Sequence, residues 1–411
     1  MKKRTACLIL CVCMLLCLAM PAAAEDAGSG AAFTDQGSIR NVGAVQMLVD
    51  LGLISGYTDG TFRPDNYITR EEVAKLIAIL CTENPQAPAD VYFYDAQNSW
   101  ALDYIGYCAG QGIIGGDGMG SFRPKDNVTA QELAKMLLVI LGQDPENYSG
   151  AGWDERVNAD AQSFGIYYGL NAQVNRAVTR DNACLLIYNA MRCPAIADPQ
   201  AEGLARYVLD DLMNPKSYLE VRYDLTRYTG ILTGNEDADL TSYDGRLEAG
   251  MTKLAGHKEF AVSSDLSLIG RSVDIYVQDG RVVGMPCYVS SELYYTFENT
   301  QELTKLLSGG AFSMADDAQY YYNYNEASSD VLTRSGVQLT VIDHDGDLRF
   351  DTVLAVSGQQ GTVRSVNPLR VTVGEAVYDA EKYCASDAFR EGESVWYLEI
   401  GGRGFVRAQN G

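Results

Sequence analysis

The chain has 411 residues, a formal net charge of −22 and an ordinary globular hydrophobic fraction of 47%. Its length allows roughly two to four domains. The excess of carboxylates excludes non-specific nucleic-acid binding, which needs clustered Lys and Arg. An anionic ligand must therefore be held by a local pocket, against the field of the whole chain.

The first segment, residues 1–24, predicts an exported protein. Lys2, Lys3 and Arg4 precede an apolar stretch over 6–20, and a small-residue cleavage site follows at 22–24. This is the pattern of a secretory signal peptide. The apolar stretch is short of the ~20 residues that a spanning helix needs, so a membrane anchor is disfavoured. We expect no membrane span after cleavage.

An internal repeat follows the signal peptide. Residues 52–64 read GLISGYTDGTFRP, and sixty positions later 112–124 read GIIGGDGMGSFRP. A decayed third copy keeps Thr179-Arg180 but has a shorter central loop without the Phe-Arg-Pro triplet. We therefore expect three copies, over 33–90, 91–148 and 149–195.

Each copy predicts a pair of helices. Apolar residues at helical spacing lead to Gly52 and to Gly112, where a left-handed residue would end the first helix. The second helix begins at Thr69 with Glu72 three residues on, a capping box that Thr129 and its following Glu repeat. One such pair cannot bury its apolar face alone, whereas three copies packed about a shared axis can.

These motifs resemble the S-layer homology (SLH) family. The resemblance rests on Gly56-Tyr57, on 59–64 (DGTFRP), on 68–72 (ITREE) and on the openings Phe33-Thr34-Asp35 and Tyr94-Asp95-Ala96. It covers roughly residues 33–193. It implies a pseudo-threefold helical SLH bundle that anchors the protein to a secondary cell-wall polysaccharide, often pyruvylated, of a Gram-positive-type bacterium. The family's main ligand residue is the Arg of its Thr-Arg-Ala-Glu motif.

The matching arginines are Arg70 and Arg180, while the second copy has Ala130 there. Arg70 lies in the first turn of a helix, where the macrodipole disfavours a cation. A guanidinium beside free N–H groups makes an anion site and suits a carboxylate. The alternative is a solvated or ion-paired Arg. The secondary ligand candidates are Arg63, Arg123, Tyr57, Gly56 and Gly116, although turn bracing is the favoured role for the two arginines and packing for the tyrosine.

The C-terminal half changes from helical spacing to strand-like alternation. A linker helix is expected within 196–215, at 204–213. Small β-barrels or β-sandwiches are expected at 216–290 and 358–411, around a mixed segment at 291–357. A weak repetition supports the pair, because Gly230-Ile231-Leu232 resembles Gly361-Thr362-Val363 and residues 270–276 resemble 392–398.

Two features of the C-terminal half leave alternatives open. Asp343, Asp345, Asp347 and Asp351 suggest a calcium site. However, Gly346 comes too early for an EF-hand loop, so an acidic hairpin between two strands is favoured. The tyrosines of 320–324 suggest either a sugar-stacking platform or, as we favour, ordinary strand packing.

The function predicted from the sequence is non-catalytic. Neither His257 nor His344 lies in a nucleophile or metal motif, and we expect no cofactor. The chain is predicted to be a cell-surface scaffold or display protein, held by wall polysaccharide and able to associate laterally. Two alternatives remain: a wall-anchored polysaccharide hydrolase, since paired carboxylates need no local spacing, and an adhesin that binds glycans through its tyrosines.

Overall fold

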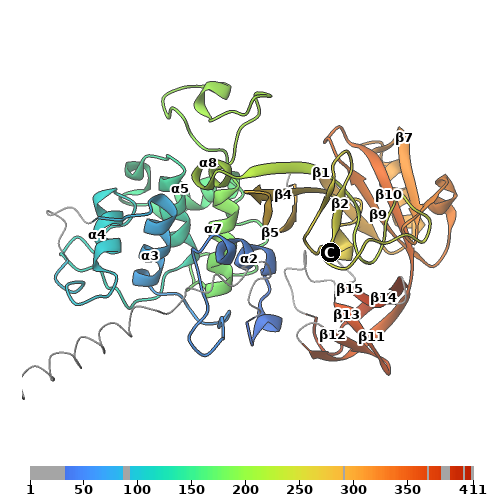
Figure 1. Cartoon of the computed structure of the whole chain (residues 1–411), viewed down its shortest axis with the longest axis horizontal. Helices are drawn as coiled ribbons and strands as arrows, with labels where there is room; N and C mark the ends of the chain where they lie inside the picture. Colours follow the sequence, from blue (N-terminus) through green and yellow to red (C-terminus); the bar gives the residue numbers. More distant parts are fainter. Residues whose placement is uncertain are drawn as a thin grey trace, which may run out of the picture. The chain divides into compact units, whose positions relative to one another are not determined.

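The computed structural model describes residues 33–86, 93–289, 292–367, 370–380, 389–400 and 403–408 (Figure 1). A helical N-terminal region is followed by a β-rich C-terminal part. The predicted signal peptide lies outside the described residues. Within them, none of the helices has both the length and the apolar character that crossing a bilayer requires.

The helical region consists of paired helices, as the repeat predicted. The second helices begin one residue after Thr69, Thr129 and Thr179, whose hydroxyls each accept from the N–H three residues on. The capping boxes form in the first two copies, and the third lacks the returning carboxylate. The six helices are α2 (Val42–Asp50), α3 (Arg70–Cys81), α4 (Leu102–Gly110), α5 (Ala130–Ile140), α6 (Trp153–Ser163) and α7 (Arg180–Met191).

Three backbone hydrogen bonds join the copies in a closed cycle. Ile68 N–H donates to Val178, Val178 N–H donates to Val128, and Val128 N–H donates to Ile68, at N···O distances of 3.2, 2.8 and 3.1 Å. Each residue lies just before the capping threonine of its copy. The starts of α3, α5 and α7 are therefore tied to one another directly.

The helical core continues into the first β-sheet. Tyr276, Val283 and Cys287 belong to the same cluster of buried residues as the helices. Asp50 of α2 accepts from Gly284 N–H at 2.8 Å. A Cβ on Gly284 would lie 2.5 Å from the end of the Met47 side chain. The first sheet is thus packed on α2, and no free linker separates the two.

The prediction of a linker helix at 204–213 is wrong. Only a 3-10 turn forms at Gly203–Arg206, and bridges such as Leu209 with Pro215 make a short antiparallel excursion. The Asp210 carboxylate accepts from Leu212 N–H at 2.9 Å, which closes a turn where the helix was predicted. A short helix, α8 (Tyr218–Tyr223), follows this excursion.

In the part of the chain that the structure describes, the strands form three sheets. The first has the order β3-β2-β1-β4-β5, the second β6-β9-β10-β7-β8 with helix α9 (Thr300–Ser308), and the third closes into a barrel, β11-β12-β13-β15-β14. The strands are β1 (Thr226–Gly234), β2 (Thr252–Leu254), β3 (Glu259–Phe260), β4 (Ser272–Gln278), β5 (Arg281–Tyr288), β6 (Leu293–Phe297), β7 (Ser313–Tyr322), β8 (Asn325–Ala327), β9 (Val337–Asp343), β10 (Arg349–Ser357), β11 (Gln359–Asn367), β12 (Arg370–Val373), β13 (Ala376–Ala380), β14 (Ser394–Ile400) and β15 (Arg403–Ala408).

The first and third sheets share one strand order. Read from β13, the barrel runs β13-β12-β11-β14-β15, which repeats β3-β2-β1-β4-β5. Gly230 pairs with Val273 in the first sheet, and Gly361 pairs with Val395 in the third. These are the segments of the weak repetition. The barrel closes through a parallel β13–β15 pair, whereas the first sheet is open. The two expected small β-barrels or β-sandwiches are therefore one open sheet and one barrel.

The segment predicted to be a mixed β segment forms a five-stranded sheet together with helix α9. Its strands β9 and β10 form the antiparallel hairpin that the sequence predicted around the acidic turn. Strand β7 pairs in parallel with β10 and carries the tyrosine run. Tyr320 and Tyr322 pack against one core cluster and Tyr321 against another, as alternation along a strand requires.

Candidate functional site

The loop between the two helices is built alike in the first two copies. Asp35 accepts from the N–H groups of Phe62 and Arg63 at 2.8 Å, and Asp95 does the same for Arg123 and the residue before it. Arg63 and Arg123 have φ of 57° and 61°, the left-handed region uncommon outside glycine. The aspartates therefore hold both arginines in strained turns, a feature often found at ligand sites.

Gly56 and Gly116 are needed by the close packing of these loops. A Cβ at Gly56 would lie 2.7 Å from the Phe33 ring, and one at Gly116 would lie 2.5 Å from the carbonyl oxygen of Ser121. Neither leaves room for a side chain. The structure thus gives both glycines a packing role, and their contact with a ligand stays a prediction.

We call the contact region between two neighbouring copies a seam. The first seam joins α3 to the loop of the second copy. Arg70 Nε donates to the Phe122 carbonyl and its Nη2 to the Gly115 carbonyl, both at 2.9 Å. Its residue is only 7% exposed. Burial lowers the pKa of this guanidinium, although the Glu132 carboxylate 3.9 Å away acts to raise it. Arg70 therefore fixes the neighbouring loop, and the 52% exposed side chain of Arg123 meets solvent beside it.

The second seam joins α7 to the loop of the first copy in the same way. Arg180 Nε donates to the Phe62 carbonyl at 3.1 Å and its Nη2 to the Ser55 carbonyl at 2.6 Å. The Tyr57 ring lies 5.2 Å from this guanidinium and 4.1 Å from that of Arg63. Arg63 is 42% exposed and pairs with Asp59 at 2.7 Å. The seam therefore combines an aromatic ring with two cations.

Sequence reasoning missed a second side-chain contact, made by an acidic residue, across the first and the second seam. Glu71, next to Arg70, is buried and accepts from the Ser99 hydroxyl and Trp100 Nε1, both at 2.7 Å, and from Lys125. Asp181, next to Arg180, is buried and accepts from the N–H groups of residues 40 and 41 and from the Asn41 side chain. The available signal was an acidic residue directly after each motif arginine.

The third seam, between α5 and the third copy, lacks both contacts. Ala130 takes the place of the arginine and is buried. Gln131 takes the place of the acid, and its Oε1 accepts from Asn158 Nδ2 at 3.5 Å, a long bond. The backbone bonds of the other two seams are kept, from Ala130 N–H to the Arg176 carbonyl and from Gln131 N–H to the Val174 carbonyl. The lost arginine and the shortened loop of the third copy thus belong to one seam.

The acidic hairpin brings three of its four candidates together. One carboxylate oxygen from each of Asp343, Asp345 and Asp351 lies within 4.8 Å of the other two, and Asp347 does not belong to this group. The buried Asp343 carboxylate accepts from the N–H groups of Asp345, Gly346 and Leu348. These bonds stabilise the hairpin turn, and calcium binding by the three carboxylates stays a prediction.

A serine, a histidine and a glutamate also meet in the β-rich part. The Ser272 hydroxyl and the Glu292 carboxylate both lie 3.0 Å from Nδ1 of His344, and Nε2 faces Thr352. A nucleophile relay needs the two ring nitrogens to serve the nucleophile and the acid separately. This cluster, with Arg271 bound to Glu292 at 2.8 Å, therefore joins strands and makes no relay.

Comparison with known proteins matches two segments, residues 32–74 and 92–134, to the S-layer homology domain. A relative from Bacillus anthracis named an uncharacterized cell wall amidase is 38% identical over 33% of this chain and 27% of its own. S-layer protein EA1 of the same organism is 32% identical over 23% of this chain and 11% of its own. A cell surface protein of Thermoanaerobacter kivui is 22% identical over 74% of this chain and 39% of its own. The chain thus spans well under half the length of these relatives.

Proposed function

We propose that the protein is anchored non-covalently at the bacterial cell surface, and that the first two seams bind an acidic wall polysaccharide. The three copies would form a pseudo-threefold SLH bundle, supported by the closed cycle of hydrogen bonds between their helix starts. The observation that carries the binding proposal is the Tyr57 ring, whose centre lies 4.1 Å from the guanidinium of Arg63 and 5.2 Å from that of Arg180. A ring beside two cations fits a sugar that bears a carboxylate.

The arginines divide the work in this proposal. Arg70 and Arg180 hold the neighbouring loop through its carbonyls and supply positive charge from within. The more exposed Arg63 and Arg123 meet the ligand. A local excess of cations is required because the chain as a whole carries −22. A pyruvate ketal on the polymer would supply such a carboxylate.

Sedimentation with purified wall sacculi tests the proposal. The double variant Arg63→Ala with Arg123→Ala should lose most binding and keep its thermal unfolding midpoint, because both side chains are exposed. Arg70→Ala with Arg180→Ala should lose binding as well. Arg176→Ala, an exposed arginine of the third seam, is the matched control and should bind normally. Unchanged binding by the first double variant would refute the proposed sites.

Sacculi stripped of acid-labile ketals identify the chemical group. If pyruvate is the ligand, the unmodified chain should fail to sediment with stripped sacculi and should bind intact ones. Equal binding to stripped and intact sacculi would show that the pyruvate ketal is not the bound group.

We further propose a non-catalytic role as a surface scaffold, exported by the signal peptide of residues 1–24 and able to associate laterally. The competing hydrolase proposal draws support from the relative named a cell wall amidase. A zymogram on wall material separates the two: clearing of the gel by the full chain would favour the hydrolase.

A further inference from the structure

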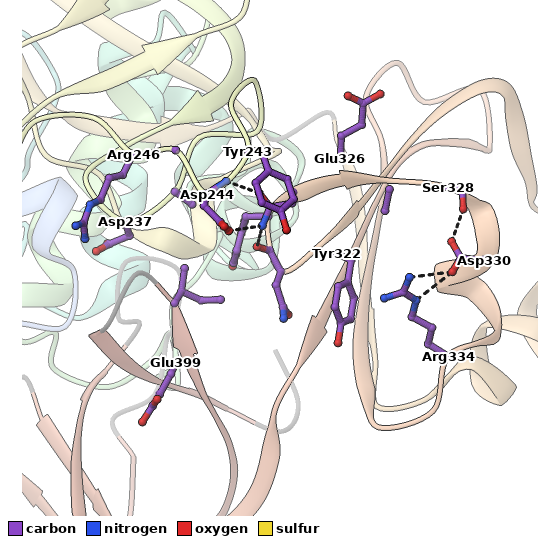
Figure 2. Close-up of a pocket in the computed structure, with 17 residues that line it drawn as sticks. Asp237, Tyr243, Asp244, Arg246, Tyr322, Glu326, Ser328, Asp330, Arg334 and Glu399 are labelled. Atoms are coloured by element: carbon purple, nitrogen blue, oxygen red, sulfur yellow. Dashed lines mark hydrogen bonds and ion pairs between the residues drawn. The ribbon is translucent and has the colours of Figure 1, made fainter.

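A cavity of about 770 Å³ opens in the β-rich part (Figure 2). Its lining comes from the loop 237–246 after β1, from 322–334 around β8, and from Glu399 and Ile400 at the end of β14. None of these residues belongs to the helical copies. Most of the lining side chains are polar, which suits a hydrated ligand better than an apolar one.

Tyr243 stands out in this lining because its side chain is exposed on a fixed loop. The residue is 82% exposed. The adjacent Asp244 N–H donates to Asn325 Oδ1 at 2.6 Å, and Asn325 Nδ2 donates back to Asp244 Oδ1 at 3.2 Å. These reciprocal bonds tie the loop to the β7–β8 turn. An exposed ring on a fixed backbone loses little entropy when a ligand stacks on it.

The lining contains two further aromatic rings, of which Tyr324 is buried and Tyr322 is covered by a cation. The Arg334 guanidinium lies 4.2 Å from the centre of the Tyr322 ring and pairs with Asp330 at 2.8 Å. Figure 2 shows this group on a different wall from Tyr243. One wall of the cavity therefore offers an open aromatic face, and another offers hydrogen-bond donors and acceptors held in place.

The charge of the cavity is opposite to that of the seams. Its lining contains five carboxylates, at residues 237, 244, 326, 330 and 399, against two guanidiniums at 246 and 334. Glu326 and Glu399 are exposed. Carboxylates accept hydrogen bonds from sugar hydroxyls and repel acidic groups. The wall polymer proposed for the seams is thus unsuited to this cavity.

We propose that the cavity binds an oligosaccharide that carries no acidic group. The apolar face of one sugar ring stacks on Tyr243, and hydroxyl groups donate to the carboxylates around it. This second glycan site is chemically distinct from the seams and does not depend on them. A protein held by one polysaccharide would then carry a site for another.

Calorimetry on the full chain tests the site with three probes: chitotetraose, cellotetraose and tetragalacturonate. At least one of the two uncharged probes should bind, and the acidic probe should not. Preference for chitotetraose assigns the ligand to N-acetylated wall-type glycans, and preference for cellotetraose to a plain external glucan. Failure of both uncharged probes, or tighter binding of tetragalacturonate, would overturn the proposal.

Variants place the binding at Tyr243. Tyr243→Ala should weaken binding about tenfold, a typical loss for one aromatic contact, while Tyr243→Trp should retain it. Tyr94→Ala removes another exposed tyrosine, from the helical region, and should leave probe binding unchanged. Arg70→Ala with Arg180→Ala should also bind the probe normally, so failure here is distinct from failure of wall anchoring. Unchanged affinity in Tyr243→Ala would place any binding elsewhere.

Discussion

The first and third seams differ although both join the same kinds of element. At the first seam Arg70 and Glu71 each reach into the second copy, one to loop carbonyls and one to the start of α4. At the third seam Ala130 and Gln131 offer no guanidinium and one long amide bond. The acceptor loop has been shortened there as well. A candidate groove is therefore a property of two neighbouring copies, and it disappears from both sides together.

The buried acid should account for the largest difference in stability between the seams. Glu71→Ala removes the acceptor for Ser99, Trp100 and Lys125, and at about 1.5 kcal/mol for each bond to a charged group the loss is about 4.5 kcal/mol. Gln131→Ala removes one weak bond and should cost less than about 0.5 kcal/mol. Urea unfolding of the two variants measures both. Equal losses would show that the two seams contribute alike.

The parts of the fold that follow local chemistry were predictable. A threonine three residues before a glutamate, directly before an apolar helical pattern, indicates a helix start, and the predicted starts at Thr69 and Thr129 are confirmed. Alternation predicted strands β9 and β10 and the acidic turn between them. At 204–213, however, the expected linker helix does not form, and the Asp210 carboxylate closes a turn there instead.

The seams were not predictable in the same way because they depend on distant partners. The sequence indicated Arg70 as a candidate ligand residue. It gave no sign that carbonyl groups forty-five and fifty-two residues away would accept hydrogen bonds from its guanidinium. It therefore ranked Arg70 above Arg123, whereas the structure buries the first and exposes the second. The register of β1 with β4 was only hinted at by a weak repetition.

The two intact seams should respond to pH with opposite sign. Burial raises the pKa of Asp181 from its usual 3.8 to about 6, although its hydrogen bonds with residues 40 and 41 act to lower the pKa. Burial also opposes ionisation of Glu71, but its bonds to Lys125, Ser99 and Trp100 lower its pKa overall. The Asp181 contribution is thus fully present below about pH 4 and is lost as pH rises through 6. The Glu71 contribution is lost as pH falls.

The rise of the Asp181 pKa from 3.8 to about 6 corresponds to a change of about 3 kcal/mol in the free energy of unfolding, because each pKa unit is worth about 1.36 kcal/mol. Asp181→Asn cannot titrate, so its stability relative to the unmodified chain should rise by about this amount between pH 4 and pH 7. Urea unfolding at several pH values measures the difference, with Gln131→Ala as the control whose profile should parallel the unmodified chain. A parallel profile for Asp181→Asn would contradict the prediction.

Restoring the arginine alone should not restore the third seam. Ala130 is 1% exposed, so Ala130→Arg forces a long cationic side chain into a filled site, at about 2 kcal/mol. The Phe-Arg-Pro loop that supplies carbonyl acceptors in the other copies is absent here, and the new guanidinium would find no equivalent partners. We therefore expect lower stability in urea and no gain in binding to sacculi. A gain in binding would mean that an arginine at a helix start suffices for the groove, and that the neighbouring loop is dispensable.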